Sequence, residues 1–153
     1  MMLAAEPVWA SSAEPLAALH ARCFDAGWSA REIGSLLNLP GCIGLACRVD
    51  GKYAALALFR QALDEAELLT LATDPAYRRR GLADILLTAG ETRLFDQGVA
   101  RIFLEVSQNN PGAAALYQRA GYAEVARRKG YYRDGSDARV LEKWLRKDGQ
   151  TGP

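Results

Sequence analysis

The sequence has few of the residues that bind metals in proteins. Its 153 residues include three cysteines, no Cys-x-x-Cys pair and a single histidine, His20. Structural zinc sites take their ligands from closely spaced pairs of cysteine and histidine, so this pattern argues against a metal site. We expect no metal, and we interpret Cys23, Cys42 and Cys47 as small buried thiols.

The chain also lacks a long apolar run, a basic-then-apolar leader and an excess of charge of either sign. Half of its residues are hydrophobic, but no stretch approaches membrane-spanning length, and 19 basic residues face 18 acidic ones. Such a balance creates no broad field for binding nucleic acid or a membrane surface. We expect a cytoplasmic protein with neither partner, and any basic site should be local.

The motifs of two common nucleotide-binding folds are missing as well. There is no Gly-x-Gly-x-x-Gly, and Gly51-Lys52 is followed by Tyr53, where a Walker motif needs serine or threonine. A dinucleotide-binding Rossmann site and a P-loop are therefore excluded.

What the chain does contain is a succession of helix and strand patterns in the length of one domain. This length can bury a core without disulfides, so we place a single domain at residues 1–147 and a flexible tail at 148–153. The predicted helices cover residues 12–23, 30–38, 82–97 and 111–120, and the predicted strands cover 42–49, 53–59, 66–73, 101–106, 122–132 and 138–145. This order indicates a mixed α/β protein built on one sheet.

Cap residues predict the starts of the first two helices. Ser11 with Glu14, and Ser29 with Glu32, match the capping-box pattern, in which a serine and a glutamate three residues later satisfy each other's backbone N–H groups.

Turn residues predict the strand connections. Asp50-Gly51 is a strong hairpin signal, so the flanking strands should pair antiparallel. The strand at 66–73 extends this meander and ends before Asp74-Pro75, because proline cannot donate to a ladder. Asn110 and Pro111 fit the cap and first position of a helix.

The segment "RRRGLA", residues 78–83, places three arginines directly before a predicted helix. A helix N-terminus exposes unpaired N–H groups and a partial positive charge, which suits a phosphate, and a glycine lets that ligand approach the backbone. Arginines at this end oppose the helix dipole, and an anionic ligand would offset the mismatch. The alternative is a solvated basic loop whose arginines extend into water.

Glu105 lies within the apolar segment "RIFLEV", residues 101–106. A carboxylate there is costly unless it is paired or hydrogen-bonded. It can serve as one half of a structural salt bridge with an arginine or as a general base, and the residues alone leave both roles open.

Tyr117 shares an apolar helix face with Ala113, Leu116 and Ala120. Core packing is the ordinary role of such a residue. A phenol that faces a substrate can instead donate a proton.

Three longer segments together resemble a known family. In this order, "DEAELLTLATDPAYRRRGLADILL", "LEVSQNNPGAAALYQRAGY" and "RRKGYYRDGSDA" are similar to the GNAT acetyltransferases, and among these to the RimI-type ribosomal-protein-alanine N-acetyltransferases. Arg78, Gly81 and Ala83 match the Q/R-x-x-G-x-G/A signature, and "FDAGWS", residues 24–29, resembles the aromatic-Trp-Ser segment of the family. The resemblance implies the GNAT fold: a mostly antiparallel sheet of about six to seven strands, splayed at its two central strands and flanked by about four helices.

The resemblance also implies acetyl-CoA as the cofactor. In the family, backbone groups of the strand before the signature bind pantetheine by a form of strand addition. The signature loop and helix start bind the pyrophosphate, and an asparagine also contacts the cofactor. The residues implied here are Leu71, Ala72 and Thr73 for pantetheine, Arg78, Arg79, Arg80, Gly81, Leu82, Ala83 and Asp84 for pyrophosphate, and Asn110.

By the same resemblance, Glu105 is the general base and Tyr117 the general acid of acetyl transfer to a protein N-terminal amine. The implied acceptor is the N-terminal alanine of a small-subunit ribosomal protein. We expect the protein to be a monomer or a weak homodimer. An N-terminal amine has a pKa near ~8, so it must lose a proton before it attacks a thioester. A backbone N–H of residues 71–73 can stabilise the oxyanion, and no metal is required.

Tyr131 and Tyr132 match the paired tyrosines that help shape the family's peptide groove. Two adjacent tyrosines on an exposed strand can also be packing residues with solvated hydroxyls. The sequence departs from the family here, because "DGSDA" is shorter than the family's D-G-x-E-D-A and Arg127 replaces an apolar residue. These departures bear on the choice of acceptor.

Three alternatives remain open at this stage. The first is a GNAT acetyltransferase that acts on lysine or on a small-molecule amine, and the second is a non-catalytic acyl-CoA-binding module. The third is RNA binding by the three arginines, which the near-neutral net charge disfavours.

Overall fold

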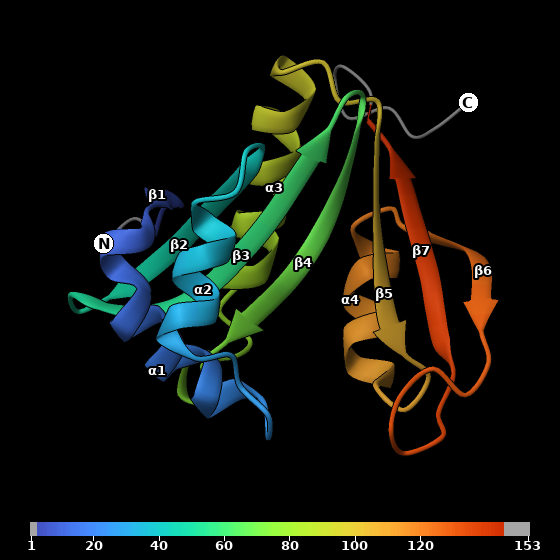
Figure 1. Ribbon diagram of the computed structural model, residues 1–153, viewed down its shortest axis with the longest axis horizontal. Coiled ribbons are helices and arrows are strands. Elements are labelled where there is room, and N and C mark those ends of the chain that lie inside the picture. The colour runs from blue at the N-terminus through green and yellow to red at the C-terminus, as the bar shows by residue number, and fades with distance from the viewer. Residues whose placement is uncertain (1–2, 146–153) are drawn as a thin grey trace.

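The computed structural model describes residues 3–145, which form one seven-stranded sheet with four α-helices (Figure 1). The sheet order is β1-β2-β3-β4-β5-β7-β6, which confirms the predicted mixed α/β class with one central sheet. The predicted domain end at residue 147 and the tail at 148–153 lie outside the described residues. The strands are β1 (Glu6–Val8), β2 (Cys42–Val49), β3 (Lys52–Ala62), β4 (Glu65–Thr73), β5 (Arg101–Ser107), β6 (Ala123–Arg128) and β7 (Ala138–Trp144). The α-helices are α1 (Ala13–Cys23), α2 (Ala30–Leu37), α3 (Leu82–Asp96) and α4 (Pro111–Arg119), and short 3-10 helices cover Ala10–Ser12 and Pro75–Tyr77.

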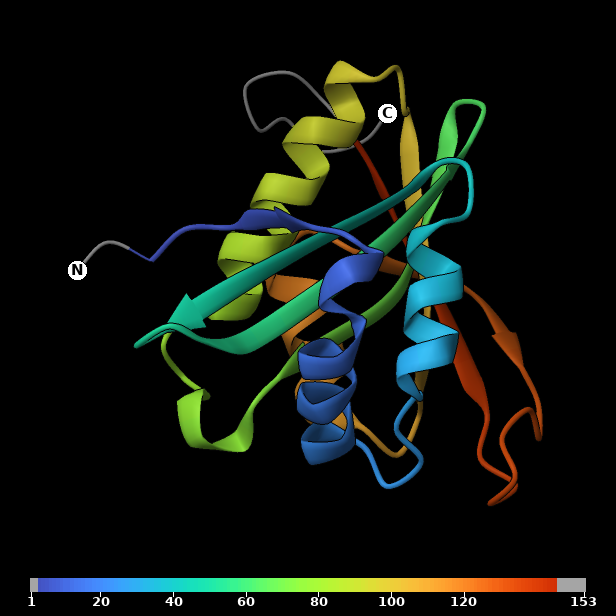
Figure 2. The same ribbon diagram turned by 60° about the vertical axis from the view of Figure 1, so that its left-hand side comes forward.

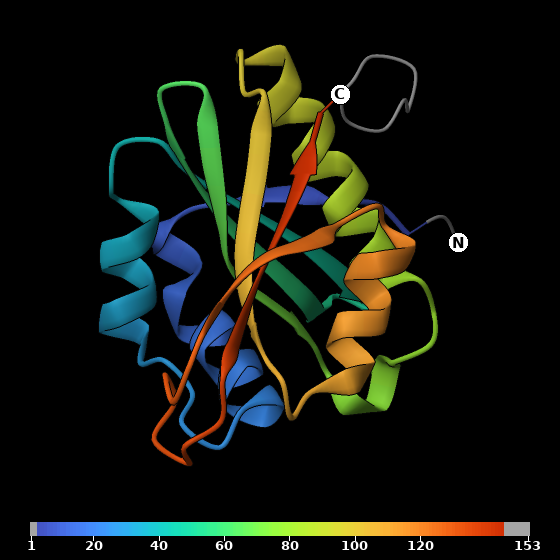
Figure 3. The same cartoon turned by 90° about the vertical axis from the view of Figure 1, so that its right-hand side faces the viewer.

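Helices cover both faces of the sheet. α1 and α2 lie over one face, whereas α3 and α4 lie over the other (Figures 1 and 3). The larger apolar cluster lies on the α3 and α4 face and includes residues of β2 to β5 and β7, and a smaller cluster lies under α1 and α2.

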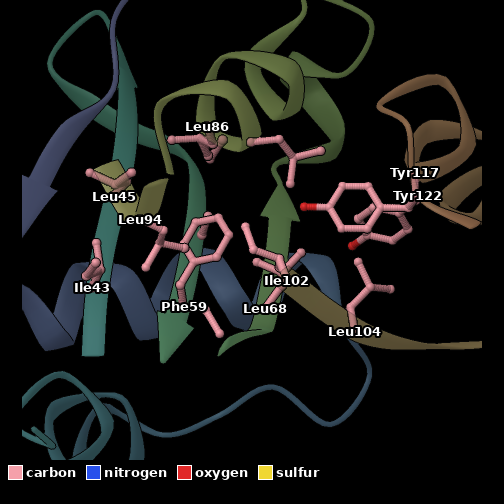
Figure 4. Packing of buried hydrophobic residues seen from close by; sticks show 14 of the residues in the cluster. Ile43, Leu45, Phe59, Leu68, Leu86, Leu94, Ile102, Leu104, Tyr117 and Tyr122 are labelled. Atoms are coloured by element: carbon pink, nitrogen blue, oxygen red, sulfur yellow. The ribbon is translucent and has the colours of Figure 1, made fainter. Parts of the chain in front are cut away.

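A glycine lets α3 pack closely on β3. A Cβ atom at Gly90 would lie 2.3 Å from the ring of Phe59, which is fully buried. Figure 4 shows Phe59 beside Leu94 of the same helix. Substitution at this glycine would displace the helix or the ring, so the contact fixes the position of α3 relative to the strands.

The two central strands are paired over only part of their length. β4 and β5 run parallel and pair at three positions, which end at Glu67 and Phe103, while the other strand pairs are antiparallel. Beyond this point residues 68–73 of β4 and 104–107 of β5 diverge, and we call this region the splay (Figure 1). At the paired end, Arg101 of β5 forms ion pairs with Glu65 of β4 and Glu142 of β7.

A β-bulge in β4 changes the direction of its side chains. Leu58 pairs with Thr70 and Phe59 with Leu68, so Leu69 is an extra residue in the ladder. Leu68 therefore packs in the cluster under α3, whereas Thr70 contacts His20 of α1 on the opposite face.

Two local predictions about the ends of elements are wrong. The Ser29 and Glu32 capping box is present, but Ser11 and Glu14 form none. Ser11 instead lies inside a 3-10 turn in which the N–H of Ser12 donates to Trp9, so α1 begins only at Ala13.

The strand predicted at 122–132 also ends early, at Arg128. Gly130 takes a left-handed φ of 60° and its N–H donates to Asp137, which turns the chain out of the ladder. The short strand β1 was not predicted.

Candidate active site

The splay leaves backbone groups of β4 facing the gap between β4 and β5. The N–H of Asp74 donates to the carbonyl of Ala54, so Asp74 faces β3. Residues of an antiparallel ladder alternate in direction, so Ala72 also directs its N–H and C=O toward β3, whereas Leu71 and Thr73 direct theirs toward the splay. Of the three residues expected to bind pantetheine, two therefore have backbone groups available for strand addition.

The arginine loop follows directly and turns back on the end of β4. Arg78, Arg79 and Arg80 are all exposed. The Nε of Arg78 donates to the carbonyl of Thr73 at 3.3 Å, and the guanidinium of Arg80 lies 5.3 Å from the centroid of the Tyr77 ring. Arg79 has a φ of 65°, an uncommon left-handed conformation for a side chain with a Cβ.

The N-terminus of α3 leads out of this loop. Gly81 is its N-cap with a φ of 77°, makes no side-chain cap, and has no atom within 4 Å of the place where a Cβ would lie. The first-turn N–H groups of Leu82, Ala83 and Asp84 have no partner within the helix by its geometry. The side chain of Leu82 is buried in the core, so this residue can offer a ligand only its backbone.

Asn110 caps α4. Its Oδ1 accepts from the N–H of Ala113 at 3.2 Å, and its side chain is exposed. The capping role uses the oxygen and leaves the amide nitrogen to contact a cofactor.

Glu105 lies on the α1 and α2 face of β5, because its neighbours Leu104 and Val106 point into the larger cluster. Its side chain is 19% exposed, and its Oε1 lies 3.1 Å from Nε of Arg128 on β6. An ion pair of the kind considered from the sequence is therefore present, with an arginine outside the "RRR" run. Arg128 is itself 59% exposed, so an incoming ligand can reach this pair.

A second carboxylate shares this region. Glu67 is the last residue of β4 that pairs with β5, on the same face as Glu105. Burial raises the pKa of Glu67, and the charge of Glu105 raises it further, against the opposing effects of Arg128 and Arg60. Glu67 was not predicted as a site residue, although a carboxylate within the apolar segment "AELLTLAT" is the same signal that singled out Glu105.

Tyr117 lies on the opposite face of β5. It is 8% exposed and packs edge-on against Tyr122, with ring centroids 5.9 Å apart. Burial raises the pKa of Tyr117 to about 12, so the phenol stays protonated at neutral pH. Glu105 and Tyr117 therefore lie on opposite faces of β5 (Figure 4 shows Tyr117 near Leu104).

Tyr131 and Tyr132 lie in the turn after β6 rather than on a strand. Their rings meet edge-to-face at 5.1 Å, and Tyr131 is 53% exposed beneath the guanidinium of Arg128 at 5.5 Å. Burial, followed by the charge of Glu105, raises the pKa of Tyr132. The turn therefore joins Arg128 and Glu105 in one charged and aromatic group.

Within residues 3–145, no group of three or more His, Cys, Asp or Glu side chains could hold a metal ion. In the same part of the chain, no helix has the length and hydropathy of a membrane span.

Cys47 is buried as expected, and Cys23 and Cys42 are half-buried. Burial raises the pKa of all three thiols.

Known proteins with a similar sequence and structure are acetyltransferases. The [ribosomal protein bS18]-alanine N-acetyltransferase of Escherichia coli (strain K12) is 40% identical over 94 residues, which are 60% of this chain and 64% of that protein. The sequence alignment thus spans just under two thirds of the length of this relative. The crystal structure of the ribosomal-protein-S18-alanine N-acetyltransferase from Escherichia coli superposes with a TM-score of 0.88 at 30% identity, over 97% of both chains.

Arabidopsis thaliana NAA60 in complex with acetyl-CoA shares the fold, with a TM-score of 0.83 at 20% identity over 94% of this chain and 99% of that one. Residues 13–122 match the model of the acetyltransferase (GNAT) family. Since this match covers most of the chain, the protein belongs to the acetyltransferase (GNAT) family.

Proposed function

We propose that the protein transfers the acetyl group of acetyl-CoA to a protein N-terminal α-amine, and that its acceptor is the N-terminal alanine of ribosomal protein bS18. The observation that carries the proposal is the splay, with backbone groups of Leu71 and Thr73 on the β4 side and with Glu105 and Tyr117 on the two faces of β5. The proposed acceptor follows from the similarity to the bS18-alanine N-acetyltransferase of Escherichia coli.

The residues around the splay fit acetyl-CoA, which would supply the activated acetyl group as a thioester. The exposed arginine loop and the open space before Gly81 suit a pyrophosphate on the first-turn N–H groups of α3. The backbone groups of Leu71 and Thr73 suit the amides of pantetheine. The N–H of Leu71 is our candidate for stabilising the oxyanion that forms at the carbonyl carbon.

Glu105 is the proposed general base. The acceptor arrives largely as an ammonium ion, and Glu105 takes its proton directly or through one water molecule. The free amine then forms the new C–N bond while the C–S bond breaks, and the nitrogen releases its second proton to water. Arg128 must exchange its contact with Glu105 for another partner when the ammonium binds, so the ion pair holds the carboxylate in place between turnovers.

Tyr117 is the proposed general acid toward the departing sulfur. A thiol has a pKa near 8.5 and this phenol one of about 12, so complete proton transfer is uphill by about 5 kcal/mol. Tyr117 therefore contributes chiefly a hydrogen bond to the thiolate as its charge develops. The thiolate then takes the phenol proton, and the proton that the amine nitrogen released to water replaces it on Tyr117.

The test compares acetylation of two peptides by mass spectrometry. One has a free N-terminal alanine and no lysine, and the other is blocked at its N-terminus and contains one lysine. We expect acetylation of the first peptide only, and a loss of about 10²- to 10⁴-fold in kcat/KM for Glu105→Gln. Glu124→Gln is the matched control, because Glu124 pairs with Arg139 at the outer strand and lies outside the proposed site.

Modification of the lysine peptide alone would replace the proposed acceptor with a lysine side chain. Modification of neither peptide would favour a small amine or a non-catalytic acyl-CoA binder. Equal rates for Glu105→Gln and the wild-type protein would remove Glu105 from the mechanism.

A further inference from the structure

His20, the only histidine of the chain, joins three parts of the molecule through both of its ring nitrogens. It lies on α1 and is 3% exposed. Its Nδ1 accepts from the backbone N–H of Trp28 at 3.0 Å, and its Nε2 lies 3.0 Å from Oγ1 of Thr70 on β4. Because Nδ1 is an acceptor, the ring proton resides on Nε2, which donates to Thr70, and only the neutral imidazole can make both bonds.

The ring is also enclosed by aromatic side chains from the α1–α2 loop, residues 24–29. Trp28 stacks on it with ring centroids 4.8 Å apart and an interplanar angle of 13°, and Phe24 lies 4.6 Å away. The loop is pressed against α1 at a second point, where a Cβ at Gly27 would lie 2.7 Å from Cα of Ala21. Two independent contacts therefore hold this loop on the helix.

The proposed entrance for the acceptor is at the end of the sheet where this loop lies. In all three views the loop is at the same end of the sheet as the turn of residues 129–137, which contains Tyr131 and Tyr132 (Figures 1, 2 and 3). Thr70 directly precedes Leu71, whose backbone faces the splay. Phe24 keeps 40% of its surface exposed, so the loop presents an aromatic side chain beside this entrance.

We propose that His20 is a positioning residue for the acceptor: its neutral ring fixes the 24–29 loop against β4 and so sets the KM for the peptide. This inference rests on the proposed function and deepens it. His20 touches neither reacting group, so it should not alter the affinity for acetyl-CoA. Acidification opens the contact, because a protonated Nδ1 cannot accept from Trp28.

The surroundings of the ring fix the direction of this pH dependence. Burial lowers the pKa of His20, and the charge of Glu32 on α2 opposes this shift less strongly. The other side chains that face the ring carry no charge: Thr70 on β4, and Phe24 and Trp28 in the loop. The loop contact is therefore complete above the ordinary histidine pKa of about 6.5 and is lost as the pH falls through the lower folded value.

The test uses two variants that each keep one of the two bonds. The side-chain oxygen of His20→Asn can replace Nδ1 and still accept from Trp28, whereas His20→Gln reaches the Nε2 position and keeps only the bond to Thr70. Both lose the aromatic stack, so they form a matched pair. We expect an acceptor KM about fivefold to tenfold higher in His20→Gln than in His20→Asn, with equal kcat and equal dissociation constants for acetyl-CoA.

Gly27→Ala perturbs the loop while leaving the imidazole of His20 in place, because the added Cβ would crowd the backbone of His20 and Ala21. It should raise the acceptor KM in the same way. Relative to that of His20→Asn, in which the ring is absent, the acceptor KM of the wild-type protein should also rise as the pH falls through the lowered pKa of His20. Equal acceptor KM values for the Asn and Gln variants at every pH would overturn the inference.

A structural measurement separates this inference from the proposed function. In the wild-type protein, the backbone amide resonance of Trp28 should shift and its hydrogen exchange should accelerate as the pH falls through the His20 transition. A Trp28 amide that stays protected through this transition would contradict the positioning role, whether or not a peptide is acetylated. An acidification response in a protein that acetylates neither peptide would reject the proposed function alone.

Discussion

At the residue scale, the two buried tyrosines of the larger apolar cluster have different environments. Tyr122 donates to Glu91 at 3.0 Å, and Glu91 also binds Lys143, so the Tyr122 hydroxyl belongs to a closed polar group. No hydrogen bond to the hydroxyl of Tyr117 is present among the described residues. A buried phenol without a protein partner is suited to serve a ligand, because its donor is not already used.

Tyr117→Phe should therefore reduce kcat about tenfold to a hundredfold, since it removes one hydrogen bond to a developing charge. The dissociation constant of acetyl-CoA and the melting temperature should change little. Tyr122→Phe is the matched control, and it should lower the free energy of unfolding by about 1–3 kcal/mol with kcat unchanged. Steady-state kinetics and thermal unfolding of both variants check this pair, and an inactive Tyr117→Phe that has also lost its fold would point to core packing instead.

At the element scale, α3 begins at a glycine that has a left-handed backbone conformation and open space in front of it. Gly81 and Gly51 have nearly the same φ, 77° and 79°, and neither would place a Cβ near other atoms. Gly51 lies in the β2–β3 turn, away from the arginine loop. Substitution at either glycine should therefore cost a similar amount of stability, but only Gly81 lies next to the proposed phosphate site.

Gly81→Val should weaken acetyl-CoA binding about tenfold or more, because the side chain would occupy the space a phosphate needs and would distort the first-turn N–H groups. Gly51→Val should lose similar stability, about 1–3 kcal/mol, and bind acetyl-CoA normally. Calorimetric titration of both variants decides the matter. Unchanged affinity in Gly81→Val would argue against a phosphate at this helix start.

Most elements could be predicted from the sequence because their signals are local. The Asp50-Gly51 hairpin, the Ser29 cap and the Asn110 cap each depend on residues a few positions apart. The failures depend on tertiary contacts instead. Three-residue β1 is held by its pairing with β2, and the turn after Arg128 is held by Asp137, whose own backbone N–H donates to Gln108.

Individual residues of the candidate site could be predicted from the sequence, but their proximity to one another could not. Glu105 and the arginine loop stand out because a carboxylate in an apolar strand and arginines before a helix are local misfits. The partnership of Glu105 with Arg128 depends on the pairing of β6 and β5 with β7, and the proximity of Glu67 depends on the parallel pairing with β5. The bonds of His20 also join residues 50 and 8 positions apart, which no local pattern indicates.

At the scale of the whole molecule, a continuous core compensates for the incomplete sheet. The larger apolar cluster includes Leu45 and Phe59 on one side of the splay and Leu104 and Leu141 on the other. The two sides therefore share buried surface even where their strands do not pair. We propose that residues 1–147 form one cooperative folding unit.

Denaturant unfolding should then be a single transition. Trp28 lies on the β1 to β4 side and Trp144 at the end of β7, and the third tryptophan, Trp9, directly follows β1. Variants in which Trp9 and one of the other two tryptophans are replaced therefore report on one side each. We expect the two fluorescence midpoints to coincide with each other and with the loss of far-ultraviolet circular dichroism. Separate midpoints would divide the chain into two units at the splay.

The pairing of β4 and β5 at one end only means that a small rotation there moves the unpaired end of β4 by a larger distance. The three residue pairs of this junction and the ion pairs of Arg101 lie at one end of the strands, and the backbone of Thr73 lies six residues away from the last pair. At about 3.3 Å per residue this arm is about 20 Å long, so a rotation of about 3° at the junction moves its far end by about 1 Å. A change too small to break any bond at the junction would decide whether a hydrogen bond forms at the far end, which makes the distance across the splay sensitive to substitutions remote from it.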